Sequence, residues 1–124
     1  MRLLPIGLLI VCLSANSAWV SIGESESGNM EIFIDPKLIR KESTSSFTWL
    51  LKNFNTPYNG AMSHQTYNEI DCLKKRLRTL QLSQHSEQWA KGKVIFTAQY
   101  PNSDWVYAPP GSGAAVIVDV VCTK

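Results

Sequence analysis

Hydrophobic and polar positions alternate along most of this chain, in short runs that turn residues separate. These runs are residues 19–23, 30–34, 44–54, 65–72, 76–83 and 93–100. Alternation with a period of two places one set of side chains on a buried sheet face and the other set toward solvent. Short connections between such runs favour antiparallel pairing. The pattern therefore predicts an antiparallel sheet of about six strands.

The segments between these runs carry turn signals. Asp35 precedes Pro36 and is the expected cap of one helical or 3₁₀ turn at 36–40. Proline, asparagine and glycine predict a loop at 55–63, and a polar run predicts another at 83–92. Residues 101–111 are rich in proline and turn residues.

The last segment, 112–122, gives conflicting signals. Its valines and isoleucine are β-branched, which locally favours a strand. Ser112, however, follows a proline and a glycine and is a natural helix N-cap. We predict a helix that lays its apolar side across the sheet. The expected fold class is α+β: a single antiparallel sheet of about six strands with a C-terminal helix packed on it and one disulfide.

The N-terminus has the three parts of a secretory signal peptide. Arg2 is followed by a mainly apolar run at 3–13 and by small and polar residues at 14–18. The apolar run is too short to span a bilayer, so we expect no transmembrane anchor. We predict removal of residues 1–18 by cleavage after Ala18, with cleavage after Ser17 as the alternative. Residues 19–124 then form one exported domain, which is periplasmic, on the cell surface or secreted.

Two cysteines remain after processing, Cys72 and Cys122. An even pair in an exported domain predicts a disulfide, because that compartment is oxidising and a small core benefits from a covalent link. Two free thiols or a metal pair are the alternatives. Zinc needs further ligands, and His64 and His85 are not spaced to supply them. We therefore predict neither a metal nor a cofactor.

Charge adds one candidate surface. Of 12 basic residues the leader removes Arg2, which leaves 11 against 10 acidic residues and gives no global reason to expect nucleic-acid binding. The predicted partner-binding surface is the one dense basic stretch together with Trp89 in a predicted loop. The basic stretch consists of Lys74, Lys75, Arg76 and Arg78. A hairpin that carries lysine only for solubility is the alternative. Trp105 is expected to fold back as a lid over the core.

Catalytic chemistry has little support. His64 and His85 fall in predicted loops without a recognisable partner, so each is interpreted as a solvated residue. Glu69 and Asp71 share one strand face and are expected to form ion pairs with nearby lysine or arginine. Trp49 and Phe96 are the predicted aromatic core positions. We expect no enzymatic activity, because no nucleophile, base and orienting group can be named together.

Several short motifs follow one another in a recognisable order. They are Trp19 to Glu24, Ile34 to Arg40, Glu69 to Cys72, Arg78 to Leu80, Tyr100-Pro101 with Trp105, and Pro110 to Ser112 before Val121-Cys122. This series resembles the bacterial surface-adhesin protein E family across essentially the whole mature chain. The resemblance implies an exported protein of a Gram-negative bacterium, with a sheet of about six strands, a C-terminal helix and a cysteine pair.

The resemblance also implies a function. Its namesake is an outer-membrane adhesin that binds host extracellular-matrix and serum proteins, and the family also contains dimers. We therefore expect a noncatalytic binding protein whose partner is a host matrix protein or another envelope protein, with a homodimer as one assembly. The basic stretch adds an acidic polysaccharide as a further expected ligand. A periplasmic envelope or stress-associated structural protein is the alternative. Unlike the namesake, this chain lacks a convincing lipidation signal.

Overall fold

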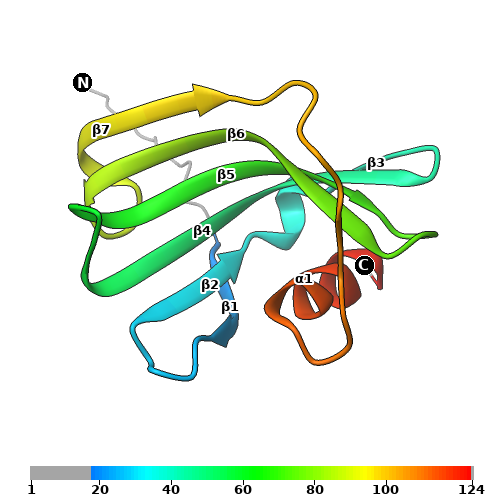
Figure 1. Cartoon of the computed structure of the whole chain (residues 1–124), viewed down its shortest axis with the longest axis horizontal. Coiled ribbons are helices and arrows are strands. Elements are labelled where there is room, and N and C mark those ends of the chain that lie inside the picture. Colours follow the sequence, from blue (N-terminus) through cyan, green and yellow to red (C-terminus); the bar gives the residue numbers. More distant parts are fainter. Residues whose placement is uncertain (1–17, 124) are drawn as a thin grey trace, which may run out of the picture.

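A computed structural model of the chain describes residues 18–123. The predicted leader therefore lies outside the described residues, apart from Ala18. One sheet curls into a half-barrel, and a helix lies against one of its faces (Figure 1). The elements are β1 (Val20–Glu24), β2 (Met30–Ile34), the 3₁₀ turn η2 (Pro36–Leu38), β3 (Arg40–Glu42), β4 (Ser45–Tyr58), β5 (Ala61–Asp71), β6 (Arg76–Glu87), β7 (Lys91–Gln99), β8 (Val106–Tyr107) and α1 (Gly113–Cys122).

The six predicted strands form the main path of the sheet. Their order is β1-β2-β4-β5-β6-β7 and each pair is antiparallel, which confirms the predicted fold class. Two short strands were not predicted: β3 pairs with β4, and β8 pairs with β6. With three and two residues they are too short to show a period-two pattern.

Two predicted loops are wrong. In place of the loop at 55–63, β4 continues to Tyr58 and β5 begins at Ala61, with a turn at Asn59-Gly60 where φ is +50° and +83°. Such a two-residue turn with positive φ joins strands tightly. In place of the loop at 83–92, β6 continues to Glu87 and β7 begins at Lys91. Polar and turn-forming residues predominate in these segments, so the hydrophobic pattern gave no signal there.

His64 and His85 consequently lie in strands and not in loops. His64 is in β5 and pairs across the sheet with Lys52 in β4, while His85 is in β6 and is buried. Their interpretation as solvated loop residues is therefore wrong. Burial lowers the pKa of both imidazoles, because desolvation disfavours the charged form.

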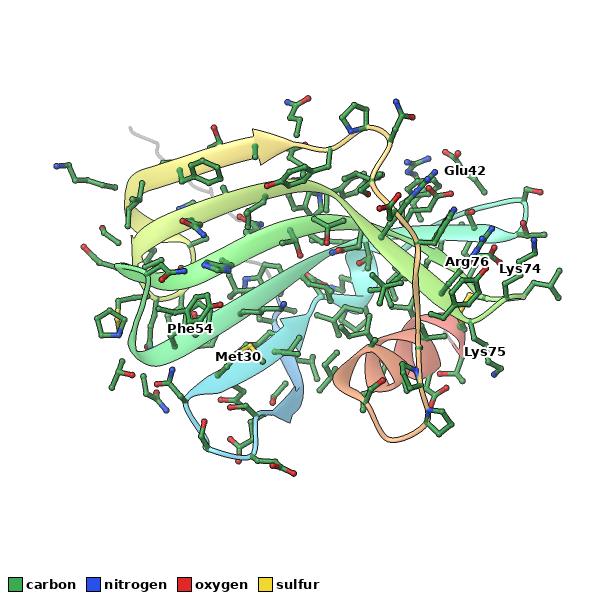
Figure 2. All side chains as sticks on the ribbon, in the orientation of Figure 1. Met30, Glu42, Phe54, Lys74, Lys75 and Arg76 are labelled. Atoms are coloured by element: carbon green, nitrogen blue, oxygen red, sulfur yellow. A yellow bond between two sulfur atoms is a disulfide. The ribbon has the colours of Figure 1, made fainter. Side chains whose placement is uncertain are left out.

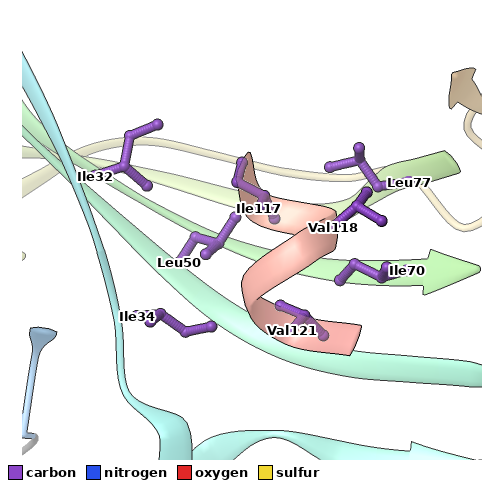
Figure 3. Close-up of a cluster of buried hydrophobic side chains, with 8 residues drawn as sticks. All are labelled: Ile32, Ile34, Leu50, Ile70, Leu77, Ile117, Val118 and Val121. Carbon is purple, nitrogen blue, oxygen red and sulfur yellow. The ribbon is translucent and has the colours of Figure 1, made fainter. Parts of the chain in front are cut away.

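Helix α1 supplies one side of the core (Figure 3). Ile117, Val118 and Val121 are buried against the sheet. The sheet residues that they meet are Ile32, Ile34, Leu50, Ile70 and Leu77. Ser112 is the N-cap as predicted, since its hydroxyl accepts a hydrogen bond from the Ala115 amide at 3.1 Å. Burial of one apolar side thus overrides the strand preference of the β-branched residues.

Two further local features, the cap of η2 and the disulfide, agree with the sequence-based expectations. Asp35 caps η2, because its carboxylate accepts a hydrogen bond from the Lys37 amide at 3.0 Å. The predicted disulfide is confirmed: Cys72, directly after β5, is joined to Cys122 at the end of α1, with the Cα atoms 5.7 Å apart. The helix is therefore held covalently to the sheet that it covers.

Phe96 is not a core residue, which corrects the sequence-based prediction. Its side chain is 48% exposed. It lies in β7, the last strand of the sheet path, where eight of the nine residues are exposed. The ten residues of α1 extend for only about 15 Å, so the helix covers the sheet from β2 to the start of β6 but does not reach β7.

Candidate interaction surface

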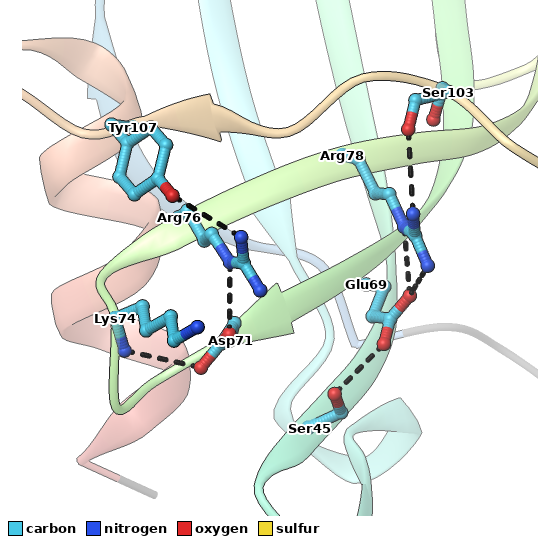
Figure 4. Close-up of polar contacts among 8 residues, drawn as sticks. All are labelled: Ser45, Glu69, Asp71, Lys74, Arg76, Arg78, Ser103 and Tyr107. Atoms are coloured by element: carbon cyan, nitrogen blue, oxygen red, sulfur yellow. Dashed lines mark hydrogen bonds and ion pairs between the residues drawn. The ribbon is translucent and has the colours of Figure 1, made fainter.

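The β5–β6 hairpin brings two arginines opposite two carboxylates (Figure 4). Asp71 pairs with Arg76 and Glu69 pairs with Arg78 in the strand register. The Arg76 Nε atom lies 2.9 Å from Asp71 Oδ2, and Arg78 Nη2 lies 2.9 Å from Glu69 Oε1. The predicted ion pairing of the two acids is confirmed. These carboxylates are therefore structural partners of the arginines.

Trp105 lies against both arginines at once. The centres of the two guanidinium groups are each 4.2 Å from the centre of its ring. Arg76 also donates a hydrogen bond to the Tyr107 hydroxyl at 3.2 Å, and Arg78 donates one to the Ser103 carbonyl at 3.4 Å. Trp105 thus covers an arginine pair and not the hydrophobic core, and these contacts fasten the segment 101–111 to the sheet.

Hydrogen bonding and charge keep the Asp71–Arg76 pair ionised. The backbone amide of Lys74 donates to Asp71 Oδ1 at 3.1 Å and lowers the pKa of that carboxyl, and the Arg76 side chain lowers it further despite desolvation. Desolvation acts to lower the pKa of Arg76, but its hydrogen bonds to Asp71 and Tyr107 outweigh this and raise it. The two predicted binding arginines therefore have compensated charges.

Lys74 and Lys75 differ from the two arginines. Both are exposed in the hairpin turn, next to Leu73, whose side chain is 78% exposed. Within the part of the chain that the structure describes, neither ammonium forms a salt bridge. The Lys75 carbonyl accepts a hydrogen bond from the Ala108 amide at 3.1 Å, so the turn itself is anchored. The exposed positive charge of this region comes from these two lysines.

Trp89 is not part of the same region. It lies in the turn after β6, whereas Arg76 begins that strand, so the length of β6 separates them by roughly 35 Å. Its ring packs on Phe33 with the ring centres 4.8 Å apart, and its amide donates to Asn53 Oδ1 at 2.8 Å. At 42% exposure it covers a small cluster on the sheet face opposite α1.

A row of aromatic rings extends across the sheet from the arginine pair. The sequence analysis did not predict this row as a surface. Arg40 lies over the Phe47 ring at 4.7 Å and donates to the Tyr67 hydroxyl at 2.9 Å. Tyr67 in turn contacts Trp49, with ring centres 4.9 Å apart. Strand alternation places these rings on the face that α1 does not cover. Trp49, which was predicted as a core position, is instead half-buried on this face.

We define the arginine–aromatic face as the half-buried side chains on this side of the sheet together with Arg40 at its edge. Its members are Arg40, Phe47, Trp49, Tyr67, Arg76, Arg78 and Trp105. Tryptophan, tyrosine and arginine are the residue types most enriched among the side chains that dominate binding energy at protein interfaces. The face therefore has the chemical composition of a protein-binding surface, with Lys74 and Lys75 at its rim.

Other kinds of site find less support. Ser83 Oγ lies 2.8 Å from His85 Nε2, but His85 Nδ1 has no hydrogen-bond partner among the described residues, so no third group orients the imidazole. Across residues 18–123 no group of three metal-ligating side chains comes together. Over the same residues, α1 is the one α-helix, and no helix is both long and apolar enough to cross a membrane.

Comparison with known proteins yields one family and one fold. The family model described as Surface-adhesin protein E matches residues 19–123. No curated protein matches the sequence. Two solved structures of Haemophilus influenzae protein E are similar, one with a TM-score of 0.63 and 14% sequence identity and a second crystal form with a TM-score of 0.60 and 15% identity. The first comparison covers 93% of this chain and 91% of that protein, and the second covers 93% and 94%.

Proposed function

The chain belongs to the surface-adhesin protein E family, and from this membership we propose that it is an exported, noncatalytic binding protein that contacts another protein through the arginine–aromatic face. The partner is a host extracellular-matrix protein or a protein of the bacterial envelope. Lys74 and Lys75 steer the encounter, because exposed charges at the rim of an interface act mainly on the rate of association.

One observation carries the proposal: the sheet face opposite α1 presents a row of half-buried aromatic rings that continues the arginine pair beneath Trp105. Stacking on Trp105 and pairing with the two acids hold Arg76 and Arg78 in fixed positions. A pre-ordered surface loses little side-chain entropy on binding. Because the arginine charges are compensated, the face favours a protein partner over an acidic polysaccharide.

Surface plasmon resonance on purified matrix proteins tests the rim and the face separately. The double variant Lys74→Ala with Lys75→Ala is expected to slow association severalfold at low salt, with little change at high salt, because salt screens exposed charges. Trp49→Ala is expected to accelerate dissociation at least tenfold, because it removes a central ring of the face.

The matched control is the double variant Lys91→Ala with Lys93→Ala. It removes the same number of lysines from β7, where Lys91 pairs with Glu87 at the opposite end of β6 from the hairpin turn. We expect it to bind like the wild type. Equal loss of binding in both double variants would show a nonspecific charge effect, and unchanged binding in the Trp49 variant would refute the proposed face.

Export is a separate part of the proposal, because its sequence signal lies in residues 1–18. Mass spectrometry of the native protein should find Trp19 or Ala18 as the first residue, and protease treatment of intact cells should remove the protein from the cell surface. A mature protein that survives such treatment, and is released with the periplasm, would instead make an envelope protein the partner. An intact leader would refute export.

A further inference from the structure

A cleft lies at the end of the sheet that α1 does not cover. It has a volume of about 310 Å³, which is at the lower end for small-molecule sites. The turn after β1 contributes Ser25 and Ser27, and β4 and β5 contribute Lys52, Phe54, Tyr58 and His64. Met30 also lines it, and Figure 2 shows Met30 and Phe54 at the other end of the molecule from Lys74 and Lys75. The cleft is therefore separate from the hairpin turn and its lysines.

Two basic groups meet in this cleft without an acid. Lys52 and His64 are directly opposite each other in the β4–β5 register. None of the residues that line the cleft is acidic, and within the described chain Lys52 forms no salt bridge or side-chain hydrogen bond. His64 Nε2 is likewise buried and has no hydrogen-bond partner there. An unpaired desolvated cation is unfavourable unless an anion compensates it.

The electrostatics of the two groups agree with this geometry. Burial lowers the pKa of Lys52, because desolvation disfavours the ammonium form. Burial also lowers the pKa of His64, and the positive charges of Lys52 and His85 lower it further. Among the described residues, every charged group that shifts the pKa of His64 is basic, which favours an anionic ligand in the cleft.

Aromatic rings form the remaining wall. His64 meets the Phe54 ring edge to face, with the centres 4.9 Å apart, and Phe54 stacks on Tyr58 at 5.3 Å. Phe54 is buried, but Tyr58 is 53% exposed and leaves apolar surface next to the two basic groups. A ligand that satisfies both features combines an anionic group with an apolar ring.

We propose that this cleft binds a small aromatic carboxylate, with its carboxylate on the Lys52 ammonium and the imidazole edge of His64 and its ring against Tyr58. The site is distinct from the arginine–aromatic face and does not depend on the proposed function. Such a ligand supplies the negative charge that none of the described residues provides at Lys52.

Calorimetric titration of the mature wild-type protein tests the proposal with three probes. Benzoate is expected to bind at least tenfold more tightly than benzamide, which has the ring but no charge, and than acetate, which has the charge but no ring. Lys52→Met keeps the length of the side chain and removes its charge, and it is expected to weaken benzoate binding at least tenfold. Lys93→Met, the matched control in β7, is expected to bind benzoate like the wild type.

Stability separates a binding lysine from a structural one. Without ligand, Lys52→Met is expected to melt at the same temperature as the wild type or higher, because it removes an unpaired desolvated charge. Saturating benzoate is expected to raise the melting temperature of the wild type and not of the variant. A lower melting temperature for the ligand-free variant, with unchanged benzoate affinity, would overturn the proposal.

One measurement needs no variant. The ring resonances of His64 in the wild-type protein should shift on addition of benzoate and stay unchanged with benzamide at the same concentration. Equal shifts with both compounds, or none with either, would overturn the proposed carboxylate site even if Lys52→Met did not fold.

Discussion

Removing the disulfide is predicted to cost a large part of the stability of this domain. The perturbation is Cys72→Ala together with Cys122→Ala, and the bridged residues are 50 positions apart in the chain. A closed loop of about 50 residues lowers the entropy of the unfolded chain by an amount worth about 4 kcal/mol at 25 °C. Both cysteines are only half-buried, so lost packing adds little to this loss. For a domain of this size the expected fall in melting temperature is roughly 15 °C.

Urea unfolding followed by circular dichroism measures this loss directly. The wild type should unfold at a higher urea concentration than the double variant, and reduction of the wild type should remove most of the difference. The reduced wild type and the variant are thus controls for each other. A difference in unfolding free energy below about 1 kcal/mol would refute the reasoning, because it would mean that the unfolded chain is already constrained around these residues.

Three further predictions concern the core, the histidines and the cover over the arginines. Ile70→Ala, at a fully buried position, should lower the free energy of unfolding by about 3 kcal/mol. Val116→Ala, on the exposed side of α1, should change it by less than about 0.5 kcal/mol. Similar values for the two variants in urea unfolding would contradict the assigned core. The pKa values of His64 and His85 are lowered in the folded state, so the unfolded state binds more protons below about pH 6.5 and stability should fall as the pH drops from 7 to 5. Replacing both histidines by Gln should flatten this dependence in thermal melts at a series of pH values. An unchanged slope would contradict the prediction. Trp105→Leu should speed hydrogen exchange of the amides around it at least tenfold without changing the exchange of the β4–β5 core, and uniform exchange rates would show that the ring does not hold its segment.

The parts of the fold that the sequence predicts well are those in which one strand face is apolar. Residues 30–34 were predicted as a strand with both boundaries correct, because Ile32 and Ile34 point into the core while Glu31 points out. The same reasoning missed the end of β4, where the residues after Phe54 are exposed. Asn55 and Thr56 are held by hydrogen bonds from their amides to Asn29, and Tyr58 pairs with Ala61. Hydrophobic periodicity reports burial, so a strand segment that buries nothing gives no signal.

The candidate sites depend on contacts that are distant in sequence. The pairing of Glu69 and Asp71 with arginine was predictable, because a short hairpin turn brings adjacent strand positions together. The stacking of Trp105 on Arg76 was not, since the two residues belong to separate elements and no local pattern relates them. The Lys52–His64 pair was hidden for another reason. Its register depends on the turn at Asn59-Gly60 and on the irregularity in β4 between Asn53 and Tyr58, and the sequence predicts a loop at 55–63 instead.

Positively charged side chains have different surroundings at the two ends of the sheet, and this difference indicates their roles. At the hairpin end, Arg76 and Arg78 each have a carboxylate, a stacked ring and a hydrogen-bonded acceptor. A cation that the chain compensates so completely contributes shape and rigidity to a surface. At the cleft end, Lys52 is desolvated beside His64 without any acid in the lining. Because such a charge lowers the stability of the ligand-free protein, the presence of Lys52 is better explained by a ligand than by the fold. The melting temperature of Lys52→Met without ligand therefore distinguishes these two explanations more directly than any binding measurement alone.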